Sequence, residues 1–335
     1  MQSVSSTLAL IAHLFPEPKA QARAVASWAG ISSLAIASGP FLGGILVTFF
    51  GWHSVFLVNV PIGIVVLLLG WISLPVTEPQ RGRSLDFPGQ VLIIIACCTL
   101  TFGLIELGHM PMLVLVASFG LAAVTGVSFV FVELRTSQPM MPMSLFRSWR
   151  ITSTMLVALL IVFTFYGAIF LFSLYFQQVY HWDALHTGLA ILPQTAPCAL
   201  MNFFVIPRLM HRLDSQKSLT LGKLICIMAS IILIVGIHTN FLVLALGELL
   251  IGIGTPFVIV PMAAVALASV EKQFSGMVSA TLNTFRQIGG ALGVAILGAA
   301  LGSQPNTSAM QVAIEILLVA FVLGFVLSAS ALRKS

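Results

Sequence analysis

The chain has very little charge. Only 7% of its 335 residues are Asp, Glu, Lys or Arg, whereas soluble domains carry roughly 25%. The hydrophobic fraction is 59%, and the mean hydropathy is +1.07. A chain of this composition cannot cover itself with polar side chains in water, which excludes an ordinary soluble fold. The net charge of +5 therefore does not indicate a nucleic-acid partner.

Cysteine is also scarce. The four cysteines are Cys97, Cys98, Cys198 and Cys226, and all of them lie in apolar runs without metal-ligand spacing. This pattern is typical of small buried side chains and excludes a disulfide framework or a zinc site. We expect no metal site and no cofactor.

Long apolar runs dominate what remains. Ten of them are long enough to cross a bilayer, which takes about 20 residues. The predicted spans are Ala24–Phe50, Val55–Leu74, Phe87–Leu107, Met112–Val132, Thr152–Phe176, Gly188–Leu209, Leu219–Ile237, Phe241–Ala268, Gly276–Leu301 and Ala309–Leu332. An apolar run that ends near Phe15 is only half a span. The predicted class is an all-α polytopic membrane protein with about ten full transmembrane helices and one partial N-terminal helix.

Loops with basic residues alternate along the chain with loops that have none. All fifteen Lys and Arg residues except Arg286 lie in or beside every second loop, with Lys223 just inside the helix that follows one of them. The intervening loops contain neither residue type. Because basic residues gather on the cytoplasmic side of membrane proteins, we predict that the basic loops and the C-terminus are cytoplasmic.

Two long cytoplasmic loops divide the chain. Residues 75–86 and 133–150 are polar and contain proline, and they bracket one pair of predicted helices. Such segments are typical of joints between bundles. We therefore expect an N-terminal bundle in residues 1–74, a central helix pair in 75–149 and a six-helix C-terminal bundle in 150–335.

The first predicted full span contains residues that weaken an isolated helix. Gly39, Gly43 and Gly44 lack side chains, and Pro40 lacks a backbone donor. In a bilayer, small residues at this spacing let a neighbouring helix approach to backbone contact. We predict a helix contact there, and we expect Gly39→Leu in a complete version of the protein to abolish transport while the protein still inserts. The segment Gly289–Gly293 has the same small-small-x-x-small pattern, which is consistent with a repeat of two halves.

Several segments resemble one transporter family. SGPFLGG at Ser38–Gly44 resembles the antiporter motif GxxxGPxxGG of drug/proton antiporters in the major facilitator superfamily, with Ala35 at the position of its first glycine. Four further segments resemble the fourteen-span branch of that family (the EmrB/QacA type), namely Gly51–Gly63, Gln138–Ser148, Tyr175–Pro193 and Ser279–Gly298. The matches follow in order along nearly the whole chain.

This resemblance implies the major facilitator fold, a bacterial inner membrane, drug export and proton antiport. It places Met1 within the fourth helix of the family, so residues 1–74 would hold helices four to six. The expectation is an N-terminal truncation or a misassigned start, without the helix-four arginine that is usually linked to proton coupling.

Three charged residues within the predicted spans are candidates for a functional role. Arg286 lies near the middle of its helix, where a charge costs at least ~2.5 kcal/mol, so a cavity or the bundle interior is favoured over snorkelling to the cytoplasmic interface. Glu248 and Glu315 lie in the outer third of theirs. They either attract a cationic substrate or carry protons, or they are rim carboxylates in contact with water.

Two functions remain open on the sequence. The first is secondary active efflux, in which lipophilic or cationic small molecules leave the cell in exchange for protons across the lipid bilayer. The sequence contains no catalytic or ATP-binding constellation, which excludes an enzyme and leaves an ion gradient as the driving force. The alternative is a truncated remnant that does not transport. The use of an efflux-system partner protein stays open, and no nucleic-acid partner is expected.

Overall fold

The computed structural model describes residues 18–73, 86–107, 110–136, 143–209, 213–270, 275–302 and 305–332, together with residues 139 and 141. All regular structure in these residues is helical. In chain order the helices are α2 (Pro18–Phe50), α3 (Ser54–Leu57), α4 (Asn59–Ser73), α5 (Phe87–Ile105), α6 (Met112–Arg135), the 3-10 turn η1 (Met143–Arg147), α7 (Trp149–Gln178), α8 (Ala184–Leu200), the π-helical turn η2 (Met201–Val205), α9 (Ile206–Leu209), α10 (Ser215–Gly236), α11 (Phe241–Gly254), α12 (Pro256–Ala268), α13 (Ser275–Leu301) and α14 (Thr307–Leu332).

The helices follow the predicted spans closely. Nine helical segments in the described residues are long and apolar enough to cross a membrane. The tenth predicted span lies in α2, whose described apolar stretch Leu34–Phe50 is shorter than these nine. The all-α polytopic fold is therefore confirmed, while the partial helix predicted before Phe15 lies outside the described residues.

Two of the predicted spans are interrupted where proline changes the regular hydrogen bonding of the backbone. The span at Phe241–Ala268 breaks between α11 and α12 because Pro256 has no N–H to donate, and Thr255 Oγ1 donates to Ile251 O at 2.8 Å. The helix α8 contains Pro193 and Pro197 and passes into η2 and α9. A π-helical turn after two prolines marks a point where a helix can bend.

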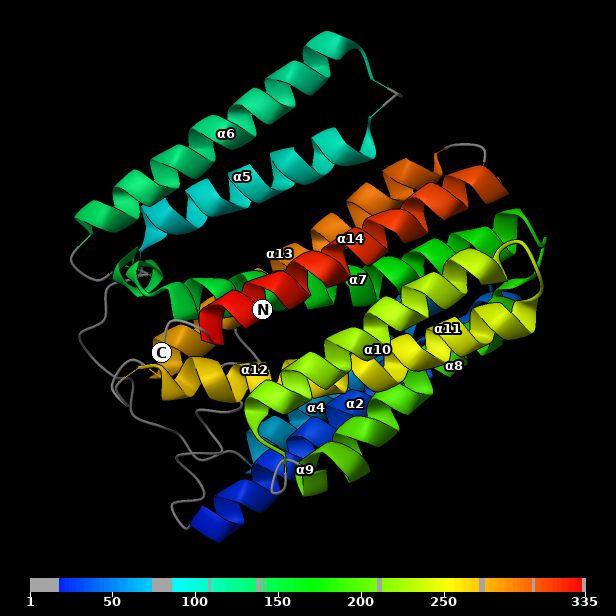
Figure 1. Cartoon of the computed structure of the whole chain (residues 1–335), viewed down its shortest axis with the longest axis horizontal. Helices are drawn as coiled ribbons and strands as arrows, with labels where there is room; N and C mark the ends of the chain where they lie inside the picture. Colours follow the sequence, from blue (N-terminus) through cyan, green and yellow to red (C-terminus); the bar gives the residue numbers. More distant parts are fainter. Residues whose placement is uncertain are drawn as a thin grey trace.

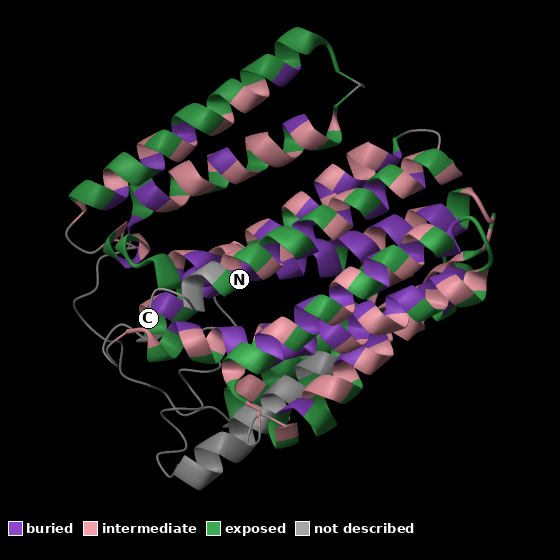
Figure 2. Cartoon of the chain, viewed as in Figure 1, coloured by how far each residue is buried: buried purple, intermediate pink, exposed green. Residues whose placement is uncertain are grey.

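The helix α7 is the centre of the molecule. It packs against α13, α14, α12 and α8, and 67% of its most apolar stretch is buried. Figure 2 shows the buried residues gathered along α7 and its neighbours. The core combines apolar side chains from α7, α10, α11, α12, α13 and α14, so the C-terminal helices form one packed bundle.

The remaining helices lie on opposite sides of this bundle (Figure 1). The pair α5 and α6 packs on itself and touches α13, whereas α2 runs along α8. The apolar stretch of α3 and α4 has no buried residue among those described. The division into residues 1–74, 75–149 and 150–335 stays a prediction.

The cysteines are free thiols in the described structure. Cys198 and Cys226 are buried, as the apolar runs predict, but Cys97 is half-buried and Cys98 is exposed. The difference arises because α5, which carries the last two, packs on other helices with only part of its surface.

Candidate functional site

The helices α2 and α8 touch at backbone distance. A Cβ atom added to Gly44 would lie 2.5 Å from the carbonyl oxygen of Ala184, and one added to Gly188 would clash with the carbonyl of Pro40. Two chain segments about 140 residues apart in sequence therefore meet through glycine. Thr195 Oγ1 extends this contact along α8 by donating to Ala37 O of α2 at 3.3 Å.

The other glycines of the motif lie away from this crossing. No described atom lies within 4 Å of a Cβ built on Gly39 or Gly43, and Gly39 is exposed. The sequence motif thus contributes Gly44 and the Pro40 carbonyl to the contact with α8. The structure gives no packing reason for the expected effect of Gly39→Leu, because the described space beside Gly39 is open.

A cavity of about 300 Å³ adjoins the crossing. This volume is at the lower end of the ~300–1,000 Å³ of small-molecule pockets. Its wall combines apolar side chains and glycines with three polar groups, and is formed by Pro40, Gly43, Gly44 and Val47 of α2, Ile169, Ser173 and Gln177 of α7, and Ala184, Thr187, Gly188 and Ile191 of α8. Motif residues of α2 thus line a space large enough for a small organic molecule.

The N-terminal end of α8 is fixed by its own cap. Asp183 Oδ1 accepts a hydrogen bond from the backbone N–H of His186 at 2.7 Å, and the His186 ring nitrogen Nδ1 lies at the same distance. The backbone N–H is the main cause that lowers the pKa of Asp183, and the His186 side chain adds to it. The carboxylate therefore stays ionised at neutral pH and caps α8 beside the Gly44–Ala184 contact.

The second glycine segment makes a crossing of the same kind. A Cβ on Gly289 or Gly293 of α13 would clash with the carbonyl of Leu159 or Phe163 of α7. Gly290 differs, because its Cβ would lie at ordinary contact distances of 3.4 and 3.5 Å from Tyr166 and Val162. Both segments with the small-small-x-x-small pattern therefore lie at backbone crossings between helices.

Arg286 lies one turn before Gly290 on α13. Its side chain is half-buried, and Nε is buried without a hydrogen-bond partner in the described part of the chain. Tyr166 of α7 lies beside the next turn of α13, because its ring is 3.4 Å from a Cβ built on Gly290. Arg286 is thus a partly buried cation whose Nε could still bind an anionic or aromatic partner.

The two acidic residues occupy different environments. Glu315 is exposed on α14 and accepts a hydrogen bond from Gln311 Nε2 at 2.9 Å, while Gln311 Oε1 lies 3.2 Å from His238 Nε2. Glu248 on α11 has no exposed surface, and neither of its carboxyl oxygens has a hydrogen-bond partner. Among the described residues, neither carboxylate forms an ion pair with Arg286.

Two buried polar residues were missed by the sequence analysis. Lys223 is 2% exposed, and its Nζ donates to the carbonyl oxygen of Gly324 on α14 at 2.6 Å. Gln194 of α8 is fully buried, and its Nε2 donates to Phe165 O of α7 at 2.9 Å. For Lys223, the only sign of burial in the sequence was its place one turn inside an apolar run. The proline-rich sequence around Gln194 gave no signal for the second.

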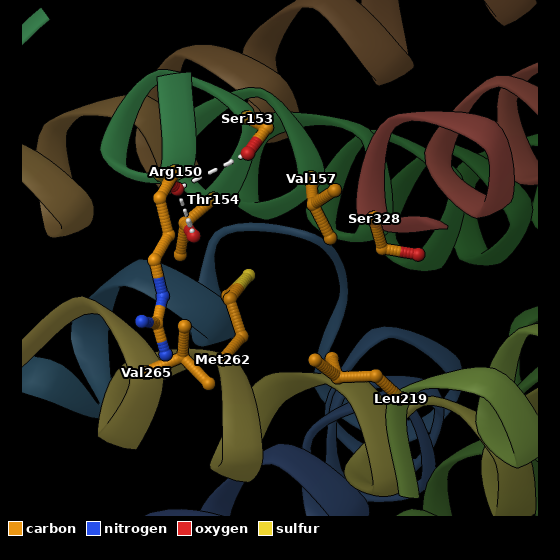
Figure 3. A pocket seen from close by; sticks show the side chains of 8 residues that line it. All are labelled: Arg150, Ser153, Thr154, Val157, Leu219, Met262, Val265 and Ser328. Atoms are coloured by element: carbon orange, nitrogen blue, oxygen red, sulfur yellow. Dashed lines mark hydrogen bonds between the residues drawn. The ribbon is translucent and has the colours of Figure 1, made fainter. Parts of the chain in front are cut away.

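A smaller cavity lies at the end of the C-terminal bundle where α7 begins (Figure 3). Its volume is about 20 Å³, which is room for a single water molecule. Ser153 Oγ and Thr154 Oγ1 donate to Arg150 O at 3.1 and 2.6 Å, so neither hydroxyl is offered to a ligand. This space is too small for an organic substrate.

The sequence profile of the Major Facilitator Superfamily matches residues 3–294. This match covers the α2–α8 crossing and most of the C-terminal bundle. The chain belongs to the major facilitator superfamily. The nine helical segments in the described residues that are long and apolar enough to cross a membrane agree with the multi-pass fold of this family.

Curated relatives in this family are named for drug resistance. The chain is 33% identical to the multidrug resistance protein Stp of Mycobacterium tuberculosis, over 89% of this chain and 56% of Stp. It is 31% identical to the drug efflux pump JefA of the same organism, over 91% and 62%. It is 31% identical to the methylenomycin A resistance protein of Streptomyces coelicolor, over 89% and 63%. The chain thus spans less than two thirds of the length of these relatives.

A solved structure confirms the fold at greater distance. The crystal structure of the POT family transporter PepTSo superposes with a TM-score of 0.58 at 15% identity, over 98% of this chain and 75% of that chain. At this identity the likeness establishes the major facilitator fold and nothing about the substrate.

Proposed function

We propose that this superfamily member is a secondary active transporter that exports lipophilic or cationic small molecules in exchange for protons. The observation that carries the proposal is the cavity of about 300 Å³ beside the glycine crossing of α2 and α8. The names of the relatives, which describe drug resistance and efflux, support the same substrate class. The motif segments support a place in the fourteen-span branch of drug/proton antiporters.

In this proposal α2 and the C-terminal bundle move against each other at the crossing. At this crossing each glycine faces a backbone carbonyl of the other helix and has no side chain that interlocks with it. The two helices can therefore tilt with little repacking. Movement there changes the shape of the adjoining cavity and alternates its access. Of the three charged candidates from the sequence, Arg286 and Glu248 are the ones that this proposal assigns to binding ions or substrate, whereas Glu315 is exposed and bound to Gln311.

Dye export tests the transport activity. A susceptible bacterial host that produces the chain should accumulate several-fold less ethidium than the empty-vector control, and a protonophore should remove the difference. Export that persists after the proton gradient is collapsed would contradict proton antiport. The same assay with Gly44→Leu separates transport through this protein from an indirect effect on the host.

A non-transporting remnant is the alternative. The apolar stretch of α3 and α4 favours it, because none of its described residues is buried by the rest of the described structure. If the alternative holds, the chain inserts into the membrane but extrudes no dye. Adding helices one to three of the fourteen-span branch, which the sequence resemblance places before Met1, should then create the activity.

The sidedness of the loops gives a separate prediction. In a background with all four cysteines replaced by serine, Lys217→Cys and Arg147→Cys should react with a membrane-impermeant maleimide only after the membrane is opened. Gln177→Cys and His238→Cys should react in intact spheroplasts. This pattern follows from the positive-inside rule and a cytoplasmic C-terminus at the inner membrane. Labelling of Lys217→Cys in intact spheroplasts would show that the true topology is the reverse of the predicted one.

A further inference from the structure

Glu248 lies at the contact of α8 and α11. A Cβ added to Gly252 of α11 would clash with the carbonyl oxygen of Gln194 of α8, so the two backbones touch at that level. Glu248 precedes Gly252 by one turn and lies on the same side of α11. Both helices begin after loops without basic residues, so they start on the same side of the membrane and run in the same direction. The turn of α11 that contains Glu248 therefore faces the turn of α8 that precedes Gln194.

Buried polar residues with unmatched oxygens lie at and near this contact: Glu248 and Gln194 are in it, and Thr187 lies two turns before Gln194, where it lines the cavity beside α2 and α7. Glu248 and Gln194 are fully buried, and Thr187 is 3% exposed. Both carboxyl oxygens of Glu248, Oε1 of Gln194 and Oγ1 of Thr187 lack a hydrogen-bond partner in the described residues. Thr187 and Gln194 are seven residues apart and so share one face of α8. Oxygens of two helices are therefore unsatisfied at one buried contact.

No neighbouring charge can hold Glu248 in its ionised form. The titratable residues of the helices packed on α11 are Lys217, Lys223 and Cys226 of α10 and His186 and Cys198 of α8, and α12 has none. Lys223 donates to Gly324 O, Lys217 is exposed, and His186 lies at Asp183. Cys226 touches the position of a Cβ on Gly254, about 9 Å along α11 from Glu248, and Cys198 lies one turn beyond Gln194.

An ionised carboxylate without a counter-ion or hydrogen bond costs several kcal/mol in such surroundings. A proton removes this cost, because the neutral acid needs no counter-ion. A sodium ion would need five or six oxygen ligands, more than this contact offers. An organic cation cannot reach a side chain with no exposed surface.

We propose that Glu248 is a proton-binding site, occupied in this conformation, and that its loss of the proton moves α8 relative to α2. The carboxylate accepts one proton to become the neutral acid and releases the same proton when the α8–α11 contact opens. The helix α8 connects this site to the crossing, because Gln194 binds Phe165 O of α7 and its neighbour Thr195 binds Ala37 O of α2. The coupling part rests on the proposed antiport, whereas the proton site does not.

Infrared difference spectroscopy tests the proton site on the purified chain in lipid nanodiscs. At neutral pH the wild type should show the carbonyl band of a protonated carboxylic acid, which Glu248→Gln removes. Glu315→Gln is the matched control, because its carboxylate is exposed and bound to Gln311; the band should remain. Should Glu248→Gln fail to fold, Glu248→Asp should keep the band at an altered frequency. A wild-type spectrum without this band, or a band that responds to sodium and not to pH, overturns the proposal.

Ligand binding tests the coupling separately. Where one proton competes with a bound dye, affinity changes by up to about tenfold per pH unit, and this dependence should disappear in Glu248→Gln but persist in Glu315→Gln. A pH dependence that survives in Glu248→Gln overturns the coupling. If no dye is bound or exported at all, the proposed function fails, while the infrared result still decides whether Glu248 holds a proton.

Discussion

Gly44→Leu is expected to reduce export to the level of the empty vector while the protein still inserts into the membrane. Even the first carbon of the new side chain would lie 2.5 Å from the Ala184 carbonyl oxygen. The opposing atom belongs to the backbone, so α8 must move away, and overpacking of this kind typically costs about 1–3 kcal/mol. The measurement is dye efflux per molecule of membrane protein. Gly188→Leu should give the same loss, because its Cβ would clash with Pro40 O from the other side.

Two variants make this result specific. Gly120→Leu places the same side chain on α6, where no described atom lies within 4 Å of the added Cβ, so efflux should stay within about twofold of the wild type. Gly39→Leu enlarges the same helix as Gly44→Leu but points into open described space. Normal efflux by Gly44→Leu would show that the α2–α8 crossing does not take part in transport. Loss of efflux in Gly39→Leu alone would place the working contact on the other face of α2.

The sequence predicts the spans well because length and hydropathy are local properties. Each predicted span overlaps a helix, and Phe241–Ala268 even agrees at both ends. Its interruption at Thr255 and Pro256 was missed, although proline was a visible signal. The reason is that apolar composition continues through the break, so hydropathy alone cannot distinguish one straight helix from two segments that share a span.

The candidate site was predictable only in part. The glycines of α2 indicate a helix contact, but the sequence does not show which neighbour they meet or which of them face it. That choice depends on the rotation of α2 against α8, and it brings Gly44 rather than Gly39 to the crossing. The burial of Lys223 and Gln194 was equally hidden, because their partners Gly324 and Phe165 contribute backbone carbonyls, which have no sequence signature.

The helix α8 explains how these separate features can act together. One face carries Gly188 and Thr195 toward α2, whereas the side chain of Gln194 binds α7 and its backbone meets Gly252 of α11. Its prolines and the π-helical turn that follows give it a place to bend on the side toward Leu200. A change at either face therefore has a direct mechanical route to the other, without a chain of intermediate residues.

The largest effect on stability is expected from adding one methyl group to α13. Gly289→Ala should strongly lower the melting temperature of the purified protein, because the new Cβ would clash with the backbone carbonyl of Leu159 on the central helix α7. Neither backbone can move without opening the core, so the cost should reach about 3 kcal/mol or more.

The adjacent Gly290→Ala is the matched control: its Cβ meets Tyr166 and Val162 at 3.4 and 3.5 Å. It should melt like the wild type or slightly higher, since alanine favours the helix. Equal melting temperatures for the two variants would mean that α7 and α13 do not cross at backbone distance.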